Sequence, residues 1–124
     1  MKAAVLVLAP AIAFVAISPA NAECKWGRFH FVFGTDSSAM ADADSGQECK
    51  LFVHTGHGST FQNLSIVQQA KHGKVAWNGS TMESALLYTS KAGYTGPDDF
   101  VFSVTGTGTI GKGTSNISVS VNVK

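Results

Sequence analysis

The amino-acid sequence predicts an all-β protein, an immunoglobulin-like antiparallel β-sandwich of about seven strands. Apolar and polar residues alternate with a period of two along much of the chain, and no segment keeps a helical period. Gly, Asn, Asp and Pro residues, which favour turns, separate the alternating runs at intervals of about ten residues. Short strands at this spacing within about 100 residues are typical of a sandwich.

Residues 1–22 have the pattern of a signal peptide. Lys2 precedes an apolar run over residues 3–17, and the segment ends on the small residues Ala20 and Ala22. The apolar run is shorter than the roughly 20 residues that span a membrane. We therefore expect cleavage after Ala22 rather than a membrane anchor, and a mature protein that is periplasmic or secreted.

Residues 23–124 are predicted to form the single β-sandwich domain. Without Lys2, eight basic residues balance eight acidic ones, and the longest run of like charge is Asp98-Asp99. This distribution lacks the basic patch that nucleic acid or an anionic membrane surface attracts. A lipid-modified cysteine must stand at the cleavage point, where this chain has Glu23. We therefore expect no nucleic-acid partner and no membrane anchor after cleavage.

The two cysteines, Cys24 and Cys49, both lie in the exported part and are predicted to form a disulfide. A loop of this length would add about 3–4 kcal/mol to the free energy of unfolding in the chain-entropy model. A reactive thiol pair would need C-x-x-C spacing or a cationic helix terminus nearby, and the sequence shows neither.

The first half of the domain is predicted to hold two strands and one long loop. Phenylalanines at alternate positions, ending at Phe33, predict a strand over residues 29–33. Residues 37–47 lack a clear pattern, and we expect a loop there with one helical turn near Met40. A short strand is expected over residues 50–54.

The second half is predicted to hold five strands. In the last one, Ile117 and three valines alternate with Ser and Asn, so one face is apolar and the other carries only hydroxyl or amide groups. Phe100, Phe102 and Val104 share a face of the strand before it. Three further pairs each share one face of an expected strand: Leu64 with Ile66, Val75 with Trp77, and Leu86 with Tyr88.

A family pattern is present in the same half. Residues 93–104 have the sequence Gly-Tyr-Thr-Gly-Pro-Asp-Asp-Phe-Val-Phe-Ser-Val, and His72-Gly73 lies in an expected turn before them. Residues 64–124 thereby resemble bacterial immunoglobulin-like, cadherin-like repeats, which carry a Pro-x-His-Gly turn and a Gly-(Tyr/Phe)-x-Gly-x-Asp-x-Phe-x-(Tyr/Phe)-x-Val signature. The resemblance implies the same sandwich fold.

The chain departs from that family at Ala70 and Ser90, where the family has proline. Both positions concern the rigidity of turns rather than the fold. The family occurs as tandem arrays in large surface proteins, whereas this chain holds one copy, so a role as a stalk spacer does not carry over. Asp98 of the signature can accept hydrogen bonds from turn amides, and we interpret it as structural rather than ligand-binding.

Two groups of residues are weak candidates for metal ligands. Asp42 and Asp44 match a cadherin calcium motif, but calcium needs six to eight oxygens and the other acidic residues are spread thinly. His54 and His57 are possible zinc or copper ligands beside a Gly-rich turn. The disulfide leaves no cysteine to join them, and no Glu accompanies them as in a helical zinc-protease motif. We interpret both groups as solvated surface residues and expect no metal and no cofactor.

Trp26 and Tyr94 are weak candidates for a sugar-stacking platform, because a sandwich can display flat aromatic rings on one face. Trp77 and Tyr88 stand at apolar positions and are expected in the core. Packing in the core or at its rim is the preferred interpretation for all four rings.

Nothing in the sequence assembles into a catalytic site. Ser, His and Asp are present, but no serine lies in a G-x-S-x-G context. Residues 106–111 match G-x-G-x-x-G between two expected strands, with no helix to offer its N-terminus to a phosphate. We interpret this segment as a flexible hairpin loop.

These features favour a non-enzymatic exported module that acts on a protein or another envelope component. Its contacts would come from loops, such as residues 92–99 and 106–113, or from an exposed sheet edge that accepts a further strand. The alternative is a small-ligand binder, for carbohydrate or a divalent metal. A hydrolase is the third and least supported hypothesis.

Overall fold

The computed structural model describes residues 24–27, 31–53, 59–77 and 85–124, and these residues are all-β. They form eight strands, one more than the sequence predicts, and they include no helix, hence none long and apolar enough to cross a membrane. The strands are β1 (Cys24–Trp26), β2 (Ser37–Ala43), β3 (Cys49–Phe52), β4 (Thr60–Gln68), β5 (Gly73–Trp77), β6 (Ala85–Ser90), β7 (Gly96–Thr107) and β8 (Lys112–Val123).

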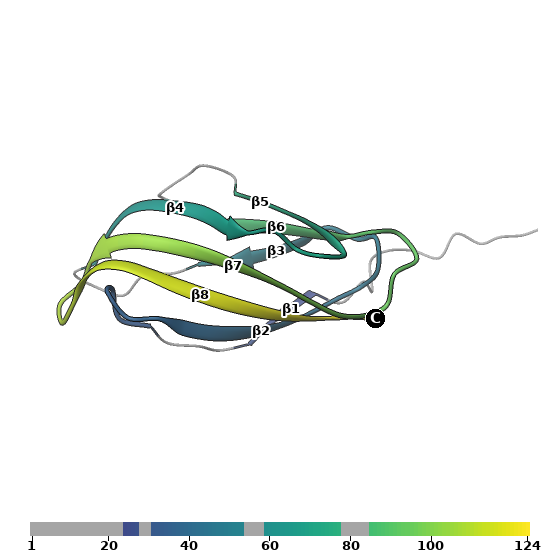
Figure 1. The fold of residues 1–124 in the computed structure, drawn as a ribbon, viewed down its shortest axis with the longest axis horizontal. Coiled ribbons are helices and arrows are strands. Elements are labelled where there is room, and N and C mark those ends of the chain that lie inside the picture. Colours follow the sequence, from purple (N-terminus) through teal and green to yellow (C-terminus); the bar gives the residue numbers. More distant parts are fainter. Residues whose placement is uncertain (1–23, 28–30, 54–58, 78–84) are drawn as a thin grey trace, which may run out of the picture.

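The strands form two sheets that enclose one hydrophobic core (Figure 1). The larger sheet has the order β1-β2-β8-β7-β4, and the smaller has the order β3-β6-β5. Strands β7 and β8 pair without interruption from Gly96 opposite Val123 to Thr107 opposite Lys112. This long ribbon ends in a hairpin at the end of the molecule away from the C-terminus (Figure 1).

The alternation predicted for the last strand is confirmed in β8. Its inward residues from Ile117 to Val123 are at most 2% exposed, whereas Ser118, Ser120 and Asn122 between them are exposed. Burying such a row of Ile and Val side chains is the main favourable term in folding. The other fully buried large side chains come from both sheets: Phe100, Phe102 and Val104 from the larger, and Leu51, Leu86 and Tyr88 from the smaller.

Strand β2 lies where a loop with a helical turn was expected, so that prediction is wrong. Ala39, Ala41 and Ala43 are buried and alternate with Ser38, Met40 and Asp42, which are exposed or half-buried. This is a strand pattern, but alanine has little apolar surface and is depleted in strands, which hid the pattern in the sequence. Strand β2 also pairs parallel to β8, so the expected fully antiparallel sandwich contains one parallel pair.

The prediction of a strand over residues 29–33 is also wrong for residues 31–33, the part that the structure describes. Residues 31–36 form a turn in which the Thr35 amide donates to the Val32 carbonyl at 2.9 Å, and Gly34 has a positive φ of 96°. Phe33 is 6% exposed and belongs to the core, with its ring edge-on to that of Phe31 at 5.3 Å. The alternating phenylalanines therefore anchor an irregular segment rather than a strand.

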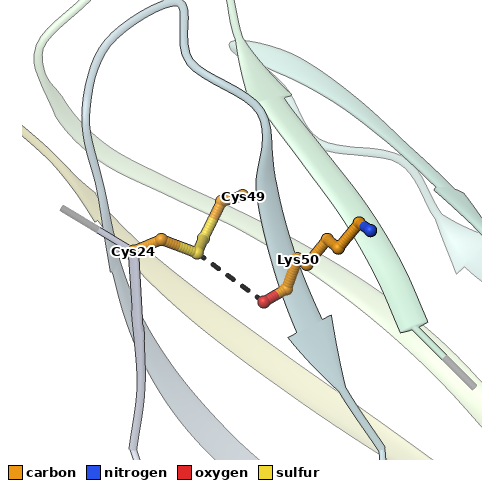
Figure 2. The surroundings of a disulfide bond; sticks show 3 residues. All are labelled: Cys24, Cys49 and Lys50. Carbon is orange, nitrogen blue, oxygen red and sulfur yellow. Dashed lines mark hydrogen bonds between the residues drawn. A yellow bond between two sulfur atoms is a disulfide. The ribbon is translucent and has the colours of Figure 1, made fainter. Parts of the chain in front are cut away.

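The predicted disulfide between Cys24 and Cys49 is confirmed (Figure 2). It joins β1, an edge strand of the larger sheet, to β3, an edge strand of the smaller one. The Cys24 Sγ also lies 3.6 Å from the Lys50 carbonyl oxygen, the dashed line in Figure 2. A disulfide sulfur has no hydrogen to donate, so we treat this approach as a contact. The bond indicates an oxidising environment, extracellular or periplasmic.

Candidate functional site

The turn between β7 and β8 consists of residues 108–111, and we call this turn the hairpin tip. It presents one large apolar side chain to solvent. The Gly108 amide donates to the Gly111 carbonyl at 2.7 Å and closes the turn. Ile110 within it is 81% exposed, more than the other exposed large apolar side chains of the described residues, Met40 at 71% and Val67 at 59%. Strand pairing runs up to Lys112, so the turn is shorter than the loop expected over residues 106–113.

Close glycine contacts hold the base of the hairpin tip against the turn of residues 31–36. A Cβ atom on Gly106 would lie 2.6 Å from the Phe33 ring and 2.4 Å from the Thr60 carbonyl oxygen. A Cβ atom on Gly111 would lie 2.5 Å from a Val32 methyl group. Such approaches are possible only without a side chain, so these glycines let the core phenylalanine pack directly under the hairpin.

A buried serine fastens the same turn to β8. The Ser115 side chain is fully buried, and its hydroxyl accepts from the Gly34 amide and donates to the Val32 carbonyl, both at 3.0 Å. One residue further along β8, the Asn116 amide donates to the Asp36 carboxylate at 3.1 Å. The hydroxyl gives the Gly34 amide its acceptor and adds a donor to the Val32 carbonyl, which also accepts from the Thr35 amide. The hairpin tip therefore stands on a base fixed by packing and by hydrogen bonds.

Towards the opposite end of the β7–β8 ribbon, a buried carboxylate organises a second turn. Asp98 is 4% exposed and accepts from the backbone amides of Lys71, His72 and Asp99 at 2.9–3.2 Å. The Tyr88 hydroxyl donates to the same carboxylate at 2.8 Å. These hydrogen bonds hold residues 71 and 72 against β7 and link them to β6. Burial, aided by the hydrogen bond to Asp98, raises the pKa of Tyr88 above its usual value.

Trp26 and Tyr94, the two aromatic residues considered for sugar binding, both pack against other parts of the protein. Trp26 is half-buried at the rim of the core, and its Nε1 donates to the Phe52 carbonyl at 2.7 Å. The Tyr94 ring stacks on His72 with 4.1 Å between ring centroids, and its hydroxyl donates to the Pro97 carbonyl. The structure places the two residues on separate elements and shows no contact between them among the described residues.

The metal candidates are only partly within the described residues. His54 and His57 lie outside them. Asp42 lies in β2 opposite Lys25 of β1, and Asp44 follows the end of that strand. Within residues 24–27, 31–53, 59–77 and 85–124, no three His, Cys, Asp or Glu side chains are close enough together to hold a metal ion.

Ile110 was not among the candidate residues predicted from the sequence. The signal was present, because Ile110 is the one large apolar residue between Gly106 and Gly113 and stands where a turn was expected. Its exposure depends on where the turn begins and ends, which the strand register determines. The partners of Ser115 could not be found from the sequence, since they lie more than 80 positions away.

No family model and no curated protein match this chain. Among solved structures, it is similar to PbICP-C in complex with falcipain-2 (10% identity, TM-score 0.43, 79% of this chain and 95% of that one). It is also similar to a sialyltransferase from Photobacterium damsela (17%, 0.38, 72% and 18%). A third is the cysteine protease inhibitor EhICP2 from Entamoeba histolytica (10%, 0.31, 73% and 98%). At these values, none of the three assigns a family to the chain.

Proposed function

We propose that this chain is an exported, non-enzymatic, immunoglobulin-like module that binds a partner protein through the hairpin tip. The observation that carries the proposal is the 81% exposure of Ile110 on a turn whose base is fixed. Two sheets around one core, the signal-peptide pattern and the disulfide support the remaining parts of the proposal.

The energetics of the hairpin tip suit insertion into an apolar pocket. Burying an isoleucine side chain contributes about 1.5–3 kcal/mol. The turn is already held in place, so little conformational entropy is lost when it binds. The tip itself carries no charge, and its Gly and Thr residues can lie flat around the anchor and exclude water. We therefore expect the partner to offer a pocket of about one aliphatic side chain with a neutral rim.

The first experiment is site-specific photo-cross-linking of the full chain in the cells that export it. A photoreactive residue at position 110 should give a discrete cross-linked product. The same residue at position 40 is the matched control, because Met40 is similarly exposed but lies within β2 of the larger sheet. The partner identified from the product is then titrated against the purified Ile110→Asp and Met40→Asp proteins.

We expect Ile110→Asp to weaken binding at least about tenfold, the loss of about 1.4 kcal/mol, and Met40→Asp to leave it unchanged. Cross-linking that is the same from both positions would contradict the proposal. So would an Ile110→Asp protein that binds the identified partner as tightly as the wild type.

A further inference from the structure

The two sheets have four lateral edges, formed by β1 and β4 in the larger sheet and by β3 and β5 in the smaller. An edge strand presents unpaired backbone groups to any other extended chain, and natural proteins usually block such edges. Among the described residues three of the edges are blocked, those of β1 and β3 by one another and that of β5 by a side chain.

The edges of β1 and β3 close on one another. The Cys24–Cys49 disulfide joins the two strands (Figure 2), and the Trp26 indole donates to the Phe52 carbonyl of β3 at 2.7 Å. Strand β1 is also only three residues long. A new strand therefore finds little regular backbone on this side of the molecule.

The edge of β5 is blocked by the side chain of Gln69, which follows β4. Its amide nitrogen donates to the Val75 carbonyl at 2.7 Å, and its amide oxygen accepts from the Val75 amide at 2.8 Å. The glutamine therefore satisfies both backbone groups of the central residue of a five-residue strand, as a neighbouring strand would.

Among the described residues, no disulfide or side-chain hydrogen bond covers the edge of strand β4, and its protection is limited to irregular pairing near its two ends. It is nine residues long, pairs with β7 on one side, and contains neither a charged residue nor a proline. Two register shifts interrupt the pairing, near Phe61 and near Gln68, and leave a regular run from Asn63 to Ile66. Val67, in the second register shift just beyond that run, is 59% exposed.

We propose that two copies of this chain associate through β4, edge to edge and antiparallel, to form a continuous ten-stranded sheet. In a two-fold arrangement each strand meets an inverted copy of itself, so a charged strand would bring like charges together. The sequence of β4, Thr-Phe-Gln-Asn-Leu-Ser-Ile-Val-Gln, carries no charge and therefore suits a second copy. The association is weak, because the regular run is short and the pairing buries little surface.

The pairing determines where the two hairpin tips lie. Thr60, at the start of β4, is opposite Thr107 at the base of the hairpin. Antiparallel pairing of two β4 strands therefore sends the two tips to opposite ends of the joint sheet. The dimer would present two separate copies of the tip, whatever each tip binds.

Sedimentation of the purified mature protein over about a hundredfold range of concentration tests the proposal. The wild type should shift from monomer towards dimer. Val67→Lys should weaken association at least tenfold, because a lysine on an edge strand disfavours pairing with a further strand. Met40→Lys, the matched change on an interior strand of the same sheet, should behave as the wild type. Thermal unfolding of both variants should find them folded, since each change is at an exposed site.

Hydrogen exchange supplies a second measurement, in which β4 amides, but not β5 amides, should exchange more slowly at high concentration. A wild type that stays monomeric throughout overturns the proposal. The proposal is also overturned if Val67→Lys dimerises as strongly as the wild type, or if Met40→Lys loses as much association as Val67→Lys. Ile110→Asp should leave the dimer unchanged; a loss of dimer in this variant would place the contact at the hairpin tip instead. Failure of either proposal therefore leaves the other intact.

Discussion

The buried carboxylate of Asp98 allows a quantitative prediction about stability. Replacing Asp98 with alanine removes the acceptor for the Tyr88 hydroxyl and for the backbone amides of Lys71, His72 and Asp99. Tyr88 is fully buried, so its hydroxyl cannot turn to water, whereas the exposed residues Lys71 and His72 can hydrate their amides at least in part.

The expected cost follows from these two classes of donor. An unsatisfied buried hydroxyl costs about 1–3 kcal/mol, and hydrogen bonds to a charged acceptor contribute about 1.5–3 kcal/mol each when fully buried. With the amides discounted for their access to water, we expect Asp98→Ala to lower the free energy of unfolding by about 3–5 kcal/mol. For a domain of this size that is a fall in Tm of at least about 12 °C.

A double-mutant cycle with Tyr88→Phe tests the reasoning by urea and thermal unfolding. Phenylalanine removes the hydroxyl that Asp98→Ala would leave without a partner, so the double variant should be more stable than additivity predicts by about 1–2 kcal/mol. An Asp98→Ala cost below about 1 kcal/mol would refute the structural role of the carboxylate. Strict additivity in the cycle would show that the Tyr88 hydroxyl is not its critical partner.

Three further predictions concern single features of the fold. Because the pKa of Tyr88 is raised in the folded state, its contribution is complete below its unfolded pKa of about 10 and is lost as pH rises further. Stability of the wild type should therefore fall above about pH 10 more steeply than that of Tyr88→Phe, and equal slopes in the two proteins would contradict the argument. Cys24→Ser should lower the free energy of unfolding by about 3–4 kcal/mol, and titration of the native wild type should find no free thiol. Gly106→Ala should lower the free energy of unfolding by about 1–3 kcal/mol, because the new Cβ would clash with backbone. Gly108→Ala should change it by less than about 0.5 kcal/mol, because the nearest atoms to the new Cβ lie 3.4 Å away. Similar losses in both variants would contradict the packing argument.

The strands with strong alternation were predictable from the sequence, because large β-branched or aromatic residues mark the inward face unambiguously. Ile117 and the valines after it in β8 are the clearest case, and Phe100 and Phe102 in β7 are another. Strand β2 was not predictable, since Ala39 and Ala41 carry too little apolar surface to distinguish the two faces. What makes the segment a strand is its long-range pairing with β8, which no local pattern reports.

The candidate site was predictable in place but not in detail. The Gly-rich segment between the last two strands predicted a hairpin, but the exposure of Ile110 depends on the register of β7 and β8. The bracing contacts of Phe33 and Ser115 join segments far apart in the sequence. The alternation of phenylalanines up to Phe33 even pointed to the wrong element, because core packing and strand formation both place apolar residues at close intervals.

The parallel pairing of β2 with β8 has a consequence for the order in which the chain acquires its structure. Asp36 and Asn116, which are joined by a hydrogen bond, stand 80 positions apart, whereas Cys24 and Cys49 are separated by 25. A chain synthesised from its N-terminus can therefore oxidise its cysteines long before β2 has a partner on its other side. Contacts between distant segments also make the search for the folded state slow. Until residues 112–123 arrive, the edge of β2 that pairs with β8 stays open, so this twelve-residue strand completes the larger sheet rather than merely extending it.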